Sequence, residues 1–92
     1  MFPVRGFEWD TGNAEKNLLK HSVTTGETEE AFFTDPLILR VKKNLYYIFS
    51  VTLGGRYLFG VFVLKPGRIV RVISIRDMEK KDRSLYKEKK GR

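Results

Sequence analysis

The fold of this 92-residue chain is decided by the stretch RYLFGVFVL, residues Arg56–Leu64. Apolar side chains occupy both the even-numbered and the odd-numbered positions of this stretch. The even positions hold Leu58, Phe62 and Leu64, and the odd positions hold Tyr57, Phe59, Val61 and Val63. A β-strand points successive side chains to opposite faces, so a strand that is apolar on both is covered on both. We therefore expect Arg56–Leu64 to be the central strand of a sheet, with helices covering one face.

Three further segments on either side of this strand are rich in β-branched and aromatic residues: Leu37–Lys43, Leu45–Thr52 and Arg68–Ile75. The separators between the four segments have hairpin-turn chemistry, and they are Asn44, Leu53-Gly54-Gly55 and Lys65-Pro66-Gly67. Connections this short join antiparallel neighbours, which predicts a β-meander.

The N-terminal third predicts a short strand followed by a helix. Val4–Trp9 alternates as a strand does, and Asp10–Asn13 then offers breaking and capping side chains. The helix that follows is expected over about residues 14–21. On a helical wheel its Ala14, Leu18 and His21 fall on one face.

Two more helices complete the expected fold. Thr24 and Glu27 have capping-box spacing at the start of the second helix, and Asp35-Pro36 ends it. A basic helix over about residues 77–89 follows the last strand, with a frayed basic tail over about residues 87–92. The prediction is one α+β domain over residues 1–92, with two N-terminal helices and one C-terminal helix around an antiparallel sheet of about four to five strands.

The charge of the chain is concentrated near its C-terminal end. Lys and Arg number 18 against 11 Asp and Glu, a net charge of +7, and residues 68–92 carry ten basic and four acidic residues, a net +6. A concentrated basic surface attracts phosphate, although a solvated basic tail would look the same in sequence. Cysteine is absent, no segment approaches the roughly 20 apolar residues of a membrane span, and Met1–Arg5 lacks a secretion signal, so we expect a cytoplasmic protein with no membrane association.

Few residues in the chain offer catalytic chemistry. His21 is the only histidine, and its ordinary pKa lies near neutrality, although a half-packed structural histidine would show the same pattern. The last strand carries Arg71 and Arg76 among apolar residues, where arginine is costly unless it is paired or needed. In a regular strand these two face opposite sides, unless a bulge intervenes near Ser74.

One histidine and several arginines around a small sheet suffice for cleaving RNA without a metal or other cofactor. Arginine neutralises charge developing on the scissile phosphate, and histidine or lysine moves the protons. If these residues are not arranged around a scissile phosphate, the same set merely binds nucleic acid. A basic surface can also bind an acidic protein partner. The residue types leave these three readings open.

The chain carries Phe7–Asp10 and Lys20-His21 near its start and Arg71–Arg76 near its end, and in these motifs it resembles the BrnT-type toxins. The opening Phe7-Glu8-Trp9-Asp10, with Asn17 and Lys20-His21 after it, resembles F-x-W-D followed by N and K-H-G-V. The ending Arg71–Arg76, with Asp82-Arg83 and Tyr86, resembles R-I-I-S-A-R and E-R-R-x-Y. The acid–arginine pair that is common before the family's middle strand is missing around Lys43-Asn44-Leu45.

This resemblance implies a RelE-like fold and a toxin that cleaves RNA to arrest growth. It implies neutralisation by a small ribbon-helix-helix antitoxin, and contact with promoter DNA only through the antitoxin complex. At the positions that match the family's motifs, the resemblance implies that His21 is the candidate general acid/base. It likewise implies that Arg76 and Arg71 are candidate phosphate ligands in the catalytic site. Lys20, Arg56 and Arg83 are candidates for holding RNA.

Overall fold

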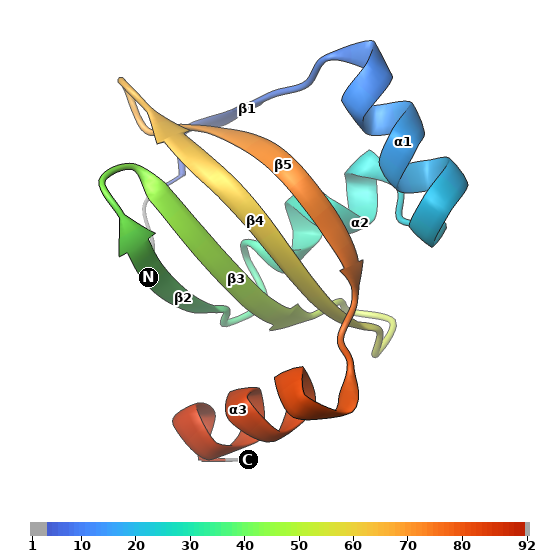
Figure 1. Cartoon of the computed structure of the whole chain (residues 1–92), viewed down its shortest axis with the longest axis vertical. Helices are drawn as coiled ribbons and strands as arrows, with labels where there is room; N and C mark the ends of the chain where they lie inside the picture. Colours follow the sequence, from blue (N-terminus) through green and yellow to red (C-terminus); the bar gives the residue numbers. More distant parts are fainter. Residues whose placement is uncertain (1–3, 92) are drawn as a thin grey trace.

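The computed structural model describes residues 4–91; the first three residues of the Met1–Arg5 stretch, and Arg92, lie outside the described part. The described chain forms one five-stranded sheet and three helices (Figure 1). The strands are β1 (Gly6–Glu8), β2 (Leu37–Lys42), β3 (Leu45–Val51), β4 (Tyr57–Lys65) and β5 (Ile69–Asp77), and the helices are α1 (Thr11–His21), α2 (Thr25–Ala31) and α3 (Lys80–Lys90). The predicted α+β class is confirmed. None of the helices within residues 4–91 has the length and apolar character that a membrane span needs.

The strand order is β1-β5-β4-β3-β2, so β4 is the central strand, as its two apolar faces predicted. Strands β2 to β5 form the expected antiparallel meander. Strand β1 instead pairs in parallel with β5, with Gly6 opposite Ile69. The predicted meander did not include this parallel pair. A strand of three residues is too short for its sequence to indicate which strand, 63 residues away, it pairs with.

A β-bulge in β5 changes which face its arginines occupy. Phe62 pairs with Val72 and the adjacent Val61 pairs with Ser74, so Ile73 is the extra residue. Without the bulge, Arg71 and Arg76 would lie on opposite faces. With it, Arg71 lies opposite Val63 and Arg76 opposite Phe59, two residues of equal parity on β4. The two arginines therefore share one face of the sheet.

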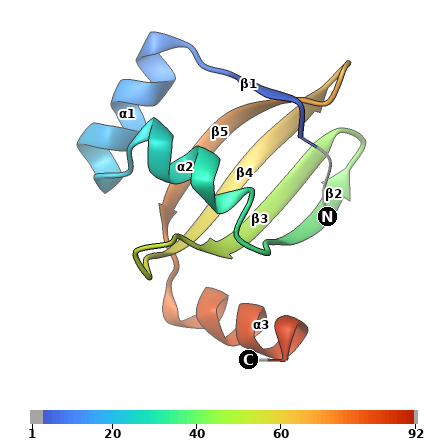
Figure 2. The ribbon, with the colours of Figure 1, turned by 180° about the vertical axis from the view of Figure 1, so that it is seen from behind.

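Helix α2 covers the other face, where the larger core lies (Figure 2). Phe32, at the end of α2, is fully buried and packs edge-to-face on Phe62 of β4, with ring centroids 5.0 Å apart. The side chain of Ile75 approaches the backbone of Gly60 closely on this face, since a Cβ added at Gly60 would lie 2.7 Å from Cδ1 of Ile75. The predicted capping box holds the start of α2: Thr24 Oγ1 accepts from the N–H of Glu27, and Glu27 Oε1 accepts from the N–H of Thr24.

Helix α3 lies below the lower end of the sheet (Figure 1) and packs against residues of the arginine-bearing face. Tyr86 of α3 packs there with Met78 and Phe49 in a second, smaller core. The helix continues through Lys87–Lys90, which the sequence assigned to a frayed tail. Two contacts explain its length: Gly91 caps it in the left-handed conformation with φ 71°, and Lys90 Nζ donates to Asp35 Oδ1 at 2.9 Å.

Helix α1 is attached to the sheet by a polar contact. The side chain of Leu18 is 49% exposed and that of Leu19 is 83% exposed, whereas Asn17 is buried. The face that the helical wheel gave to Ala14, Leu18 and His21 is therefore not the face that α1 buries most. Asn17 Oδ1 accepts a hydrogen bond from the N–H of Ile75, just after the bulge, and an apolar pattern cannot reveal a contact of this kind.

Candidate active site

Arg76 lies at the lower end of β5, where the open face of the sheet meets α3. Its guanidinium carbon lies 4.6 Å from the ring centroid of Phe59, and its Nη1 donates to the carboxylate of Asp82 at 2.9 Å and to the backbone carbonyl of Asp77. Asp82 is nearly buried. Arg76 is thus held in a fixed orientation, because the ring, the carboxylate and the carbonyl restrain it from three directions.

Arg83 of α3 is stacked in the same way on the next ring along β4. Its guanidinium carbon lies 4.1 Å from the ring centroid of Tyr57. Tyr57 and Phe59 are two positions apart on one strand, so they point to the same face. The two rings therefore present Arg76 and Arg83 side by side at the junction between the sheet and α3.

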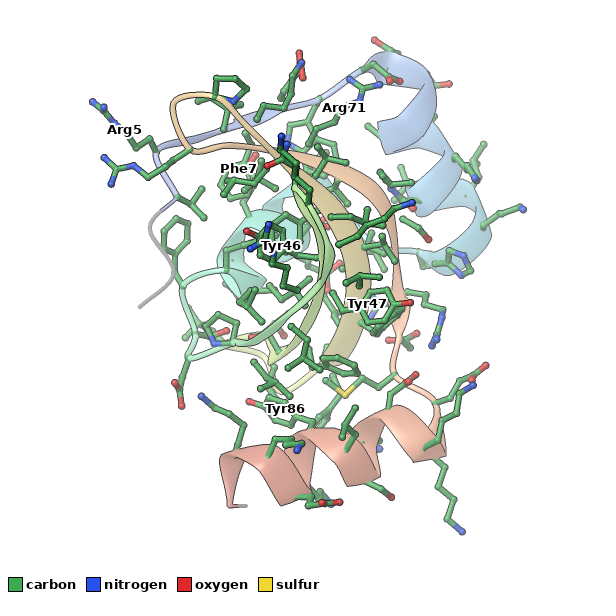
Figure 3. All side chains as sticks on the ribbon, turned by 60° about the vertical axis from the view of Figure 1, so that its left-hand side comes forward. Arg5, Phe7, Tyr46, Tyr47, Arg71 and Tyr86 are labelled. Atoms are coloured by element: carbon green, nitrogen blue, oxygen red, sulfur yellow. The ribbon has the colours of Figure 1, made fainter. Side chains whose placement is uncertain are left out.

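Arg71 lies at the opposite end of this face, remote from α3 (Figure 3). It forms ion pairs with Asp10 and, at 3.8 Å, with Glu8. Lys65 donates to the same Glu8 carboxylate at 2.7 Å and, with Arg71, lowers its pKa, the hydrogen bond from Lys65 being the larger cause. The residues opposite Arg71 and Arg76 are four positions apart on β4, roughly 13 Å at the usual rise per residue. One phosphate cannot bridge that separation.

Arg56 joins three elements beside Arg76. Its guanidinium donates to the backbone carbonyls of His21 and Ser22, each at 2.8 Å, and so satisfies two carbonyls at the C-terminal end of α1. The same group forms ion pairs with Asp77 at 2.7 Å and with Glu27 at 3.2 Å. The structure thus places this predicted RNA-holding residue in an internal network, which fixes the end of α1 against β5.

The carboxylates in this network are stabilised in their charged form. The hydrogen bond from Arg56 is the largest cause that lowers the pKa of Asp77, and the charge of His21 lowers it further. The pKa of Glu27 is lowered first by the backbone N–H of Thr24 and then by Arg56. Because Arg56 donates both to the backbone carbonyl of His21 and to Asp77, which follows Arg76 in the chain, the end of α1 that carries the half-buried histidine lies against the end of β5.

The structure therefore places Arg76 and Arg83 at one junction, joins the end of α1 to the end of β5 through Arg56, and separates Arg71 from them. Lys20 is exposed on the same turn of α1 as His21. The sequence reasoning missed the partners of these residues: Asn17, Asp77 and Asp82. Asn17 and Asp82 stand inside the two end motifs, so the motif positions were a signal, but the roles of these residues depend on contacts between distant segments.

Within residues 4–91 no three His, Asp or Glu side chains are grouped closely enough to hold a metal ion together. The chemistry that the site itself offers is cationic: two guanidinium groups held over aromatic rings, with the helix end that carries His21 joined to the same end of β5 through Arg56. Such a set can neutralise an oxyanion and move a proton.

Comparison with known families identifies the class of protein to which this mixed sheet with its three helices belongs. The family model described as the ribonuclease toxin BrnT of type II toxin-antitoxin systems matches residues 9–82. The chain belongs to this family.

The fold is also that of a solved member. The crystal structure of the Brucella abortus ribonuclease toxin BrnT matches with a TM-score of 0.68 and 17% sequence identity, over 82% of this chain and 97% of that chain. At this identity the similarity shows the fold. A search of curated proteins found no matching sequence.

Proposed function

We propose that this protein is an endoribonuclease toxin that cleaves RNA in the cytoplasm without a metal ion, and that a ribbon-helix-helix antitoxin neutralises it. Membership of a family of ribonuclease toxins supports the RNA target and the existence of an antitoxin. The observation that carries the proposal is the bulge at Ile73, which puts Arg71 and Arg76 on one face of the sheet. Arg76 then lies at the end of β5 that Arg56 joins to the C-terminal end of α1, the end that carries His21.

In the proposed reaction the 2′-oxygen of the RNA attacks the adjacent phosphorus while the bond from phosphorus to the 5′-oxygen breaks. The products are a 2′,3′-cyclic phosphate and a 5′-hydroxyl. The 2′-hydroxyl gives up its proton as its oxygen attacks, and the departing 5′-oxygen takes up a proton. His21 moves one of these two protons and water carries the other, while Arg76 neutralises the charge that develops on the phosphate oxygens. Arg71, roughly 13 Å along the strand, holds a neighbouring phosphate. Lys20 and Arg83 contact the RNA backbone, and Arg56 acts by holding the end of α1 in place.

RNA cleavage by the purified protein, freed of any partner and assayed in EDTA, tests this proposal. Wild type should leave 2′,3′-cyclic phosphate ends, and Arg76→Ala and His21→Ala should each lower the rate by about 10²–10⁴-fold while remaining folded. Arg40→Ala, which removes an exposed arginine of β2, is the matched control and should cleave like wild type. Equal cleavage by wild type, Arg76→Ala and His21→Ala would show that the assigned site is wrong.

A second function, binding of nucleic acid without cleavage, is favoured by one observation. The nearly buried carboxylate of Asp82 already occupies Arg76, so a phosphate must compete with it. The family's acid–arginine pair before the middle strand is also absent near Asn44. This alternative predicts salt-sensitive RNA binding with no turnover by the folded wild type. In both cases promoter DNA is contacted only through the complex with the antitoxin.

A further inference from the structure

One side of α3 lines an open hollow in the surface. The hollow has a volume of about 410 Å³ and is lined by Met78, Lys80, Arg83, Ser84 and Lys87. The four residues from α3 stand at positions i, i+3, i+4 and i+7, which places them on one side of the helix. Lys81 and Lys89 belong to the same helix but point elsewhere, about 100° or more from Lys80 at the usual 3.6 residues per turn. We call the four residues Lys80, Arg83, Ser84 and Lys87 the α3 stripe.

The charge of this hollow is uniformly positive. Lys80, Arg83 and Lys87 are exposed, and Arg83 is held in orientation by its stacking on Tyr57. The acidic groups near the start of α3 are directed to other partners: Asp82 pairs with Arg76, and Glu79 pairs with Lys81 at 3.7 Å. The lining therefore presents three cations and one hydroxyl group, and no carboxylate.

The lining suits phosphate better than a protein partner. Its one apolar residue, Met78, is buried, so the hollow lacks the exposed apolar or aromatic anchor that usually dominates a protein interface. Lysine, arginine and serine side chains are the usual donors to the phosphate oxygens of nucleic acids. The hollow also adjoins the candidate active site, since Arg83 stacks on Tyr57 two positions from the ring that carries Arg76.

We propose that the α3 stripe binds the phosphodiester backbone of the RNA strand beside the phosphate at Arg76. This inference rests on the proposed function for the identity of the polyanion. It assigns binding to Lys80, Ser84 and Lys87, and it separates the two sides of α3: lysines on the stripe contact phosphates, and lysines elsewhere on the helix do not.

Two double variants with equal changes of charge on one helix test this assignment. Lys80→Gln/Lys87→Gln removes two charges from the stripe, and Lys81→Gln/Lys89→Gln removes two from the rest of α3. The probe is a single-stranded RNA 12-mer with 2′-O-methyl groups, which cannot be cleaved by the proposed reaction, and fluorescence anisotropy measures its affinity at several salt concentrations. The stripe variant should weaken binding and reduce the slope of log K against log [salt] by about 1.4, or 0.7 for each lost phosphate contact. The control should change it by less than half as much.

If the slope of log K against log [salt] is the same for the two variants, whether both slopes fall or neither does, the assignment to the α3 stripe is wrong. The proposed endoribonuclease function would not be affected by that result. Displacement of the RNA by an oligoglutamate of equal charge as effectively as by unlabelled RNA would also overturn the assignment, since the stripe would then serve acidic proteins. A stripe-dependent slope in a protein that never cleaves RNA would support the stripe and refute the endoribonuclease. Wild type that binds no RNA would refute both.

Discussion

Asn17 Oδ1 accepts a hydrogen bond of 3.2 Å from the backbone N–H of Ile75, which lies two residues after the bulged Ile73. This bond joins the middle of α1 to β5 at the point where the bulge has just redirected the strand. The same contact therefore supports both the position of α1, which ends at His21, and the course of β5, which carries Arg76. It satisfies a backbone donor that lies in the core.

Replacing Asn17 by alanine should destabilise the fold by about 1–3 kcal/mol, because the buried N–H of Ile75 loses its acceptor. Urea unfolding followed by circular dichroism measures this loss. Leu19→Ala changes a side chain of the same helix that is 83% exposed, and it should alter the free energy of unfolding by less than about 0.5 kcal/mol. Similar losses for both variants would mean that Asn17 contributes only as part of α1.

Arg56→Leu should cost about 2–4 kcal/mol of stability, since it leaves two backbone carbonyls and two carboxylates without their shared donor. Arg56→Lys should recover little of this, because an ammonium group cannot reproduce the fork of the guanidinium. Unfolding in urea at pH 7 tests both variants. An Arg56→Lys protein as stable as wild type would show that only the charge matters.

The stability of the protein should fall on acidification. The pKa values of Glu27 and Asp77 are lower in the folded protein than their ordinary values, so the unfolded chain binds more protons than the folded chain near and below about pH 4. Their contribution is complete above the ordinary values and is lost as the pH falls through the lowered ones. Urea midpoints at pH 7, 5, 4 and 3 should show the decline below about pH 5. The urea midpoint should fall less steeply with pH in Arg56→Leu than in wild type. If the two proteins show the same dependence on pH, Arg56 is not the cause of the decline.

Asp82→Asn should increase affinity for RNA, because phosphate then no longer competes with a carboxylate for Arg76. The same change should cost about 1 kcal/mol of stability, since the Asp82 side chain also accepts from the N–H of Glu79 at the start of α3. Binding of the 2′-O-methyl RNA and urea unfolding measure the two effects separately. Asp35→Asn removes the same charge beside Lys90, far along α3 from Arg76, and should leave RNA affinity nearly unchanged. Lower affinity of the Asp82→Asn protein would contradict competition at Arg76.

Most of the fold could be predicted because its signals are local. The turns, the capping box at Thr24 and the two-sided apolar pattern of β4 each depend on residues within a few positions of one another. The parallel pairing of β1 with β5 could not be predicted, because it joins segments that no local pattern relates.

The sequence could propose residue types for the candidate site but not its geometry. The end motifs gave His21 and Arg76, and a bulge near Ser74 was the condition for Arg71 to share a face with Arg76; the structure meets that condition at Ile73. The engagement of Arg56 with His21, Ser22, Glu27 and Asp77 depends on three elements meeting in space. A sequence shows which arginines exist, but their partners are set by tertiary packing.

The pairing of β1 with β5 also has a consequence for when the fold can be completed during synthesis. Gly6 pairs with Ile69, and Asn17 Oδ1 accepts a hydrogen bond from the N–H of Ile75. Strand β1 and helix α1 therefore contact residues that lie about 60 positions later in the chain. The domain cannot fold progressively from its N-terminus, because strand pairing over such separations requires both segments to be available. The end of α1, which carries His21, and the end of β5, which carries Arg76, are therefore joined only after β5 has left the ribosome.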